Sequence, residues 1–245
     1  MAGAVEKALD ILMWLAEHGD DERSLSEISE GLSLNQSTCA CIMSKLKNRR
    51  FVVQPKRRGG YRLGSAAYFV GRRRGSRQDL AVAALPLMRK LAKDVDERVS
   101  LNTLDHASFL VLARVECEQE VQVSNRAVGD VFQVATGLLL LAHKDEAELQ
   151  ACLTVYNHPE KKGQPASEKV LRRKLAAIRR KGSSVEKKAD VVGIGFPVWQ
   201  GDSVVAALGL AVPTYRFTAA RGKRILKTAE RTAKAISREL GKAGE

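Results

Sequence analysis

Two closely spaced helix starts constrain the N-terminal part of this chain more than any other sequence feature. The first is Ser24-Leu25-Ser26-Glu27, a capping-box pattern in which the serine hydroxyl accepts a backbone N–H and the glutamate bonds back to the cap. It predicts a helix over 25–30 that Gly31 ends. A second start at 33–36 predicts a helix to about Lys47. Two short helices joined by a tight turn with glycine are typical of a helix-turn-helix.

A β-hairpin is predicted directly after the second helix. Two short apolar runs, 51–53 and 61–63, flank a loop rich in glycine and cations. A hairpin in this position is the wing of a winged helix-turn-helix, and Arg57 and Arg58 lie at its tip. An amphipathic helix over 4–18 precedes the pair of short helices. The apolar residues of the two short helices are available for one small core.

Cations gather on the same stretch. The net charge of +13 indicates an anionic partner such as nucleic acid or an acidic membrane surface. Residues 1–30 hold eight acids and two bases, whereas residues 31–78 hold twelve bases and no acid. We expect Lys45, Arg57 and Arg58 to contact phosphates of double-stranded DNA. A solvated face is the other interpretation of such a basic run.

The rest of the chain alternates strand-like and helix-like runs. The strand-like runs are 98–104, 108–114, 192–199 and 203–212, and the helix-like runs are 135–143, 145–153, 167–181 and 218–240. Gly201-Asp202 predicts a hairpin turn between the last two strands. We therefore expect a mostly antiparallel sheet covered by helices. The predicted division is a DNA-binding domain over 1–76 and a second domain over 77–245, which begins with a linker helix over 77–95.

Other classes of protein find little support in the residues. The four cysteines lack the spacing of a zinc site, and the four histidines do not adjoin a nucleophile in any known motif, so we expect no metal, no cofactor and no catalytic residues. The longest apolar run, 137–142, is far shorter than the roughly 20 residues that span a bilayer. We expect a cytoplasmic protein with no membrane partner. Two alternatives stay open: an enzyme tethered by its N-terminal segment, and a nonspecific nucleic-acid-binding protein.

The chain resembles the IclR family of transcriptional regulators over about residues 4–240. The matching stretches include VEKALDILMWLAEHG, LSEISEGLSLNQSTCACIMSKL, VATGLLLLA and GFPVWQGDSVVAALGLAVP. The resemblance implies an α+β chain with an N-terminal winged helix-turn-helix and a C-terminal GAF-like α/β domain that binds a small-molecule effector. It implies a regulator rather than an enzyme, and it favours a repressor. The partners implied are a palindromic operator and further copies of the chain, as a homodimer or a dimer of dimers.

The predicted recognition helix departs from the family pattern. Family members usually read P-K-S-T-x-x-R, whereas this chain has Asn35-Gln36-Ser37-Thr38-Cys39-Ala40-Cys41. Gln36 and Cys41 replace two usual cations, and each lost phosphate contact lowers the salt dependence of binding by about one unit of slope. We expect base reading to fall more to Asn35, Gln36 and Ser37, because asparagine and glutamine can bond adenine in pairs. Thr38 and Cys41 complete the expected contact set.

The resemblance also indicates an effector pocket, formed by Ala135, Thr136, Gly137, Leu138, Glu186, Gly193, Gly209 and Ala211. Phe132 is a further candidate, which either lines this pocket or fills the core. Several positions that carry polar anchors in other members are small or apolar here. Gly193 replaces a cysteine, and Gly209 and Ala211 replace two serines. A ligand carboxylate buried among such residues would be poorly paired, which costs several kcal/mol. We therefore expect an effector that is bulkier and less polar than the small organic acids bound by some members.

Overall fold

The computed structural model describes residues 3–19, 21–56, 59–71, 76–119, 128–156 and 167–242 of the chain. The chain divides into two compact units, Met1–Arg74 and Gly75–Glu245, where the sequence places the division after residue 76. Within the described ranges, every helix is too short or too polar to cross a lipid bilayer.

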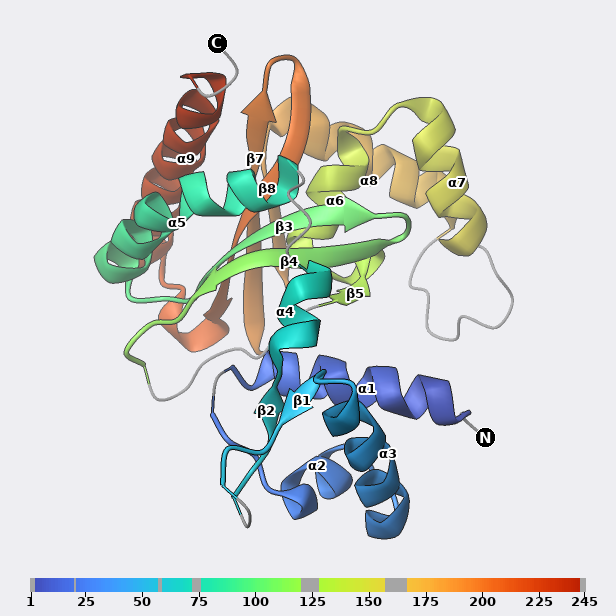
Figure 1. Cartoon of the computed structure of the whole chain (residues 1–245). Helices are drawn as coiled ribbons and strands as arrows, with labels where there is room; N and C mark the ends of the chain where they lie inside the picture. The colour runs from blue at the N-terminus through green and yellow to red at the C-terminus, as the bar shows by residue number, and fades with distance from the viewer. Residues whose placement is uncertain are drawn as a thin grey trace. The chain divides into compact units, whose positions relative to one another are not determined.

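Helices and a short hairpin build the first unit (Figure 1). The elements are α1 (Ala4–Glu17), α2 (Leu25–Gly31), α3 (Gln36–Asn48), β1 (Val52–Val53), β2 (Arg62–Leu63) and α4 (Ser65–Gly71). β1 and β2 are antiparallel, and an isolated bridge joins Arg23 to Tyr61 beside them. The helix and hairpin bounds confirm the predicted winged helix-turn-helix to within one or two residues.

The two helix starts are capped differently from one another. Ser24 forms the expected capping box, in which its backbone N–H donates to Glu27 Oε2 at 2.7 Å and its Oγ accepts from the Glu27 N–H at 3.2 Å. The second helix is capped by Asn35, whose Oδ1 accepts from the Ser37 N–H at 2.9 Å. A residue that caps a helix needs extended backbone. Ser33 has a φ of 52° instead, so it belongs to the turn before the helix and does not cap it.

The second unit is built on a six-stranded sheet in which every pairing is antiparallel. The strand order is β5-β4-β3-β8-β7-β6. The strands are β3 (Val99–Asp105), β4 (Ser108–Val115), β5 (Val128–Asp130), β6 (Ser184–Lys187), β7 (Val191–Gln200) and β8 (Ser203–Pro213). The four long central strands match the predicted runs. The short edge strands β5 and β6 were not predicted.

Helices cover both faces of this sheet (Figure 1). On one face lie α5 (Ser76–Val95) and α9 (Ala219–Lys242), and on the other lie α6 (Ala135–Ala142), α7 (Glu146–Tyr156) and α8 (Glu168–Lys181). Two 3-10 turns, η1 (Val131–Gln133) and η2 (Thr214–Arg216), precede α6 and α9. All eight residues of α6 are buried, as expected for a helix that is apolar all round.

A buried acid joins the end of α5, the start of β3 and the start of α9. Glu97 is 1% exposed, and its two oxygens accept from Arg216 Nε at 2.9 Å and Arg216 Nη2 at 2.8 Å. Arg221 Nη2 donates to Glu97 Oε1 at 3.0 Å and to the Val95 carbonyl at 3.0 Å. The hydrogen bonds to Glu97 raise the pKa of Arg216 above its usual range. The cluster fixes the chain immediately before Arg98.

Candidate DNA-binding surface and effector cavity

The recognition helix α3 has one buried side and one exposed side. Cys39, Ile42 and Met43 are buried in the core of the first unit. The opposite side is an exposed ridge formed by Gln36, Ser37, Ala40, Cys41, Ser44 and Lys45. Positions three and four apart lie side by side on a helix, so these residues form one continuous strip. The strip carries no charge before Lys45.

Hydrogen bonds orient the first residues of this ridge. Asn35 Oδ1 accepts from the Ser37 backbone N–H and, at 2.7 Å, from the Ser37 hydroxyl. Gln36 Nε2 donates to Ser26 Oγ on α2 at 3.3 Å. The Asn35 amide thereby uses its oxygen within the protein, and the Gln36 amide uses its nitrogen. Asn35 Nδ2 and Gln36 Oε1 have no partner among the described residues. Thr38 is half-buried at the flank of the ridge.

Cations flank the ridge on α3 and on the hairpin. Lys47 Nζ donates to Gln54 Oε1 at 3.5 Å, and Gln54 Nε2 donates to the Gly59 carbonyl at 3.0 Å, so one side chain joins the recognition helix to the wing. Lys45 and Lys56 are exposed and have no ion pair with an acid within the described ranges. The predicted wing contacts Arg57 and Arg58 lie outside the described residues.

Two ridge residues, Ala40 and Ser44, were not singled out from the sequence. The spacing of Cys39, Ile42 and Met43 was the available sign, because it leaves both residues facing outward. Small side chains allow a helix to approach base edges closely, and an alanine can contact the methyl group of thymine.

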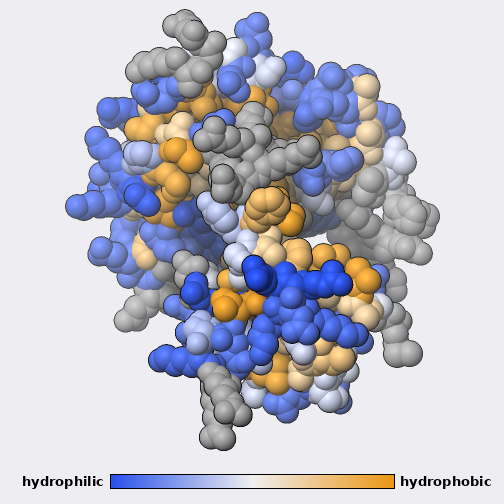
Figure 2. All heavy atoms as spheres, in the orientation of Figure 1, coloured by the Kyte–Doolittle hydropathy of each residue, from blue (hydrophilic) through white to orange (hydrophobic). Residues whose placement is uncertain are grey.

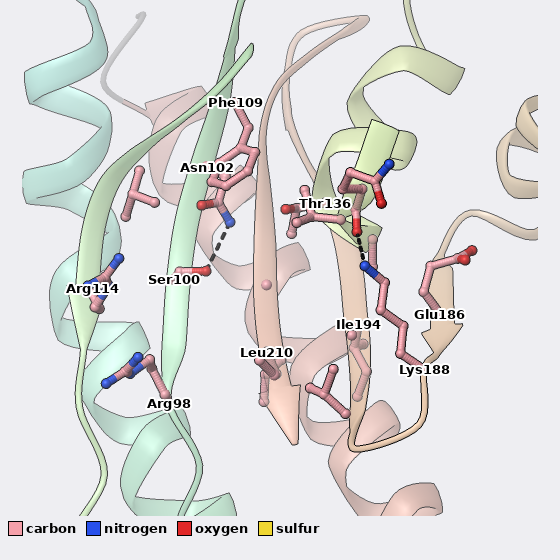
Figure 3. A pocket seen from close by; sticks show the side chains of 18 residues that line it. Arg98, Ser100, Asn102, Phe109, Arg114, Thr136, Glu186, Lys188, Ile194 and Leu210 are labelled. Carbon is pink, nitrogen blue, oxygen red and sulfur yellow. Dashed lines mark hydrogen bonds between the residues drawn. The ribbon is translucent and has the colours of Figure 1, made fainter. Parts of the chain in front are cut away.

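A cavity lies on the face of the sheet that α6 covers (Figure 3). The alternation of side chains along β3 explains its polar wall. Val99 and Leu101 pack into the core beneath α5 and α9, whereas Ser100 and Asn102 face the cavity.

Six of the nine predicted effector residues line this cavity, namely Ala135, Thr136, Glu186, Gly193, Gly209 and Ala211. The other three are buried outside its lining. Phe132 and Leu138 belong to the apolar core around α6. Gly137 packs against η1 so closely that an added Cβ would lie 2.1 Å from the Val131 carbonyl oxygen. These three residues hold α6 in place rather than face the cavity.

Polar side chains line the cavity from strands that the sequence did not implicate. Arg98, Ser100 and Asn102 from the β3 segment and Arg114 from β4 line the cavity together (Figure 3). The β-bulge between Leu101 and Asn102 shifts the pairing with β4 by one residue.

The glycines of β7 and β8 make room for α6. A Cβ on Gly193 would lie 3.3 Å from Ala135 Cβ, and a Cβ on Gly209 would lie 2.5 Å from Thr136 Cγ2. The missing side chains allow the first turn of α6 to pack directly on the sheet. The polar groups of the wall are therefore displaced toward β3 and β4.

Cations lie at both ends of the cavity. Figure 3 shows Arg98 and Arg114 at one end and Lys188 at the other. Arg98 Nε pairs with Glu116 Oε2 at 2.5 Å, and its side chain is 14% exposed. Lys188 Nζ donates to the Gln133 carbonyl at 2.8 Å, across the start of α6. This distribution of charge suits an organic anion.

Metal ligands do not cluster in the part of the chain that the structure describes. No group of three or more histidine, cysteine or acidic side chains there is placed to hold an ion.

Two family models match nearly the whole chain. The model for the bacterial transcriptional regulator IclR C-terminal domain matches residues 74–238, and the model for the IclR helix-turn-helix domain matches residues 4–56.

Individual relatives agree with these models along their full length. The transcriptional regulator XynR of Escherichia coli is 27% identical over 97% of this chain and 97% of its own. The transcriptional repressor AllR of Escherichia coli is 27% identical over 98% of this chain and 91% of its own. The crystal structure of Thermotoga maritima IclR superposes with a TM-score of 0.66 at 26% identity, covering 97% of this chain and 98% of that one.

Proposed function

The chain belongs to the IclR family of bacterial transcriptional regulators, and on that premise we propose that it represses transcription from an operator whose affinity for the protein changes when a small organic anion occupies the cavity of the second unit. Members of this family are regulators rather than enzymes. The observation that carries the proposal is the exposed ridge of α3, which is uncharged from Gln36 to Ser44 and has cations beside it.

This ridge fits a major groove. Gln36 and Asn35 present amide groups that can bond the edge of an adenine, and the small side chains of Ala40, Cys41 and Ser44 let the helix backbone come close. Lys45 and the cations of the hairpin then lie where phosphates flank the groove. We assign base reading to the ridge and orientation on the duplex to the cations, with Arg57 and Arg58 as further phosphate contacts.

A second copy of the chain covers the apolar face of α1. Ile11 and Leu15 face the core of the first unit, yet Val5, Leu9 and Met13 form a second apolar stripe that is 73%, 56% and 44% exposed. Apolar residues of α4 also reach the surface, and Figure 2 shows apolar atoms over both helices. Exposed apolar patches mark interaction sites. A two-fold dimer formed here sets two recognition helices against an inverted repeat.

The oligomer is tested with two charge insertions at similar exposure. Leu9→Asp should shift the chain toward monomer in sedimentation velocity and reduce operator affinity. Val170→Asp changes a residue that is 51% exposed on α8, and it should change neither property. Equal behaviour of the two variants would place the dimer contact elsewhere. A dimer of dimers would appear in the same experiment as a species of twice the dimer mass.

The effector we propose is an organic anion. The larger size expected from the sequence stays a prediction. The arginines and the lysine support a charged ligand, which replaces the less polar effector expected from the sequence. Binding shifts operator affinity by the difference in effector affinity between the DNA-competent state and the other state, typically about 1–3 kcal/mol. The protein acts in the cytoplasm, where the bacterial chromosome lies.

Footprinting on the DNA upstream of the protein's own gene tests the regulator assignment. The expected result is one protected inverted repeat with half-sites about one helical turn apart or a multiple of it. Competition with random duplex separates specific from nonspecific binding, because specific sites bind roughly 10³–10⁷-fold more tightly. Equal affinity for both duplexes would leave a nonspecific nucleic-acid-binding protein as the better account.

A further inference from the structure

Three hydrogen-bonding side chains converge at the middle of the cavity. Ser100 and Asn102 come from β3 and Thr136 comes from the first turn of α6. A Cβ built on Gly209 would lie 2.5 Å from Thr136 Cγ2, 3.0 Å from Asn102 Nδ2 and 3.0 Å from Ser100 Oγ, so all three side chains meet over one glycine. Figure 3 shows them between the two arginines and Lys188.

The polar capacity of this cluster exceeds what the protein itself uses. Asn102 is 3% exposed, and the one hydrogen bond of its side chain within the described residues is the donation from Nδ2 to Ser100 Oγ at 2.9 Å. Thr136 is 7% exposed, and its hydroxyl has no hydrogen-bond partner among the described residues. Whichever way the Asn102 amide is turned, one of its two ends lacks a protein partner.

These atoms are not sealed away from the cavity. The fully buried side-chain atoms that lack a partner in the described part of the chain are Arg23 Nε, His143 Nε2, Ser184 Oγ and Arg221 Nε. Asn102 Oδ1 and Thr136 Oγ1 lack a partner but do not belong to that group, so each opens onto the cavity that its residue lines. Buried polar groups are almost always satisfied. A molecule in the cavity is therefore their natural partner.

We propose that the effector is a hydroxy-substituted carboxylic acid whose carboxylate binds at the Arg98–Arg114 end and whose hydroxyl is bonded by Asn102 and Thr136. This inference rests on the proposed function of the cavity as the effector site. A hydroxyl fits the cluster because it is both donor and acceptor. It can donate to the amide oxygen and accept from a threonine or serine hydroxyl.

Discrimination follows from the unpaired groups. An acid that lacks the hydroxyl occupies the cavity but leaves Asn102 and Thr136 buried and unbonded. A site built to bond a hydroxyl rejects the analogue without it far more strongly than an apolar pocket rejects an extra methylene. We expect at least a tenfold loss of affinity for each deoxy partner of a hydroxy acid that binds.

The test is calorimetric titration of the full chain with four matched pairs of acids. The pairs are malate and succinate, mandelate and phenylacetate, 4-hydroxybenzoate and benzoate, and 3-hydroxybutyrate and butyrate. At least one hydroxy acid should bind, and it should bind at least tenfold more tightly than its partner. Equal affinity within every pair that binds would overturn the inference, and so would the absence of binding by all four hydroxy acids.

Variants assign the preference to the two side chains. Thr136→Val keeps the branched shape that packs on Gly209 but removes the hydroxyl, and Asn102→Leu removes the amide at similar volume. Each should reduce the ratio of affinities within a binding pair toward one. Thr103→Val is the matched control, because the Thr103 hydroxyl donates to the Val205 carbonyl at 3.2 Å and does not line the cavity. The ratio should be unchanged in this control.

Operator binding by the same preparations separates a failure of the effector inference from a failure of the regulator assignment. Retained operator binding by Thr136→Val and Asn102→Leu shows that the variants fold. Loss of hydroxyl selectivity with operator binding intact supports the inference. If operator binding is intact but selectivity is unchanged in both variants, the inference fails and the regulator assignment stands. If the wild type binds no operator, the proposed function fails whatever the acids do.

Discussion

Replacement of Glu97 by glutamine should be among the most destabilising single changes in the second unit. The carboxylate is 1% exposed and accepts three hydrogen bonds from two arginines, whose side chains are 10% and 30% exposed. The Glu97→Gln amide has nearly the same shape, but it loses the negative charge and turns an NH₂ group toward a guanidinium. The two arginines then lose the carboxylate that accepts hydrogen bonds from both of them.

The expected loss of unfolding free energy depends on how deeply the ion pair is buried rather than on the distance between its atoms. Removing one partner of a buried ion pair costs about 3–5 kcal/mol, because the remaining charge stays desolvated. We place Glu97→Gln near 3 kcal/mol, since the partly exposed Arg221 can regain water. Glu230→Gln is the matched control. Its pair with Lys234 is shorter, at 2.6 Å, but the side chains are 49% and 66% exposed, and such pairs contribute at most about 1 kcal/mol.

Urea unfolding measures both variants. The chain has two tryptophans, and Trp199 lies in the second unit, so a Trp14→Phe background reports that unit alone by fluorescence. With a urea m-value of about 1–3 kcal/mol/M, a loss of about 3 kcal/mol lowers the midpoint by about 1–3 M. If Glu97→Gln shifts the midpoint no more than Glu230→Gln does, the reasoning from burial is wrong.

Three further predictions concern a cysteine and a lysine of the exposed α3 ridge and a partly buried histidine of the second unit. Bound operator should protect the exposed Cys41 from alkylation, while the buried Cys39, whose thiol pKa is raised by burial, should react slowly with or without DNA; undiminished Cys41 labelling on the duplex would contradict the ridge assignment. Lys45→Gln should reduce the slope of log affinity against log salt by about 0.9 per half-site, and an unchanged slope would remove Lys45 from the phosphate contacts. Burial lowers the pKa of His143 below its ordinary 6.5, so the stability that neutral His143 contributes is complete above pH 6.5 and declines as the pH falls through the lowered pKa. His143→Phe should flatten the urea midpoint between pH 5 and pH 7, whereas His106→Ala, at a side chain 96% exposed, should leave the pH dependence unchanged.

Sequence periodicity was sufficient for the long elements of this fold. The four central strands and the helices of both units have enough residues for their apolar spacing to show, and the capping box at Ser24 placed the start of α2. β5 and β6 have three and four residues, which is too few for an alternating pattern. Their existence depends on pairing with β4 and β7, and pairing is a tertiary property.

Some residues of the candidate cavity could likewise be predicted from the sequence, and others could not. Ala135, Thr136 and Gly193 could be assigned because a family pattern marks those positions. The polar wall formed by Ser100, Asn102 and Arg114 could not be assigned. Alternation along β3 shows that Ser100 and Asn102 share a face, but only the packing of α6 shows which face is covered. Arg114 pairs with Ser100 across the two strands, next to a β-bulge between Leu101 and Asn102. The sequence does not reveal this bulge, so it does not reveal the register either.

Selection of preferred duplexes from a random pool, carried out in parallel with three proteins, addresses the role of α3 most directly. Wild type should enrich an inverted repeat. Gln36→Ala combined with Cys41→Ala should relax the base preference at symmetric positions in both half-sites, because these side chains contact base edges. Lys45→Gln should enrich the wild-type sequence with lower affinity, because it contacts a phosphate. Recovery of the wild-type sequence by the double variant, with unchanged preference at every position, would contradict the assignment of sequence reading to this helix.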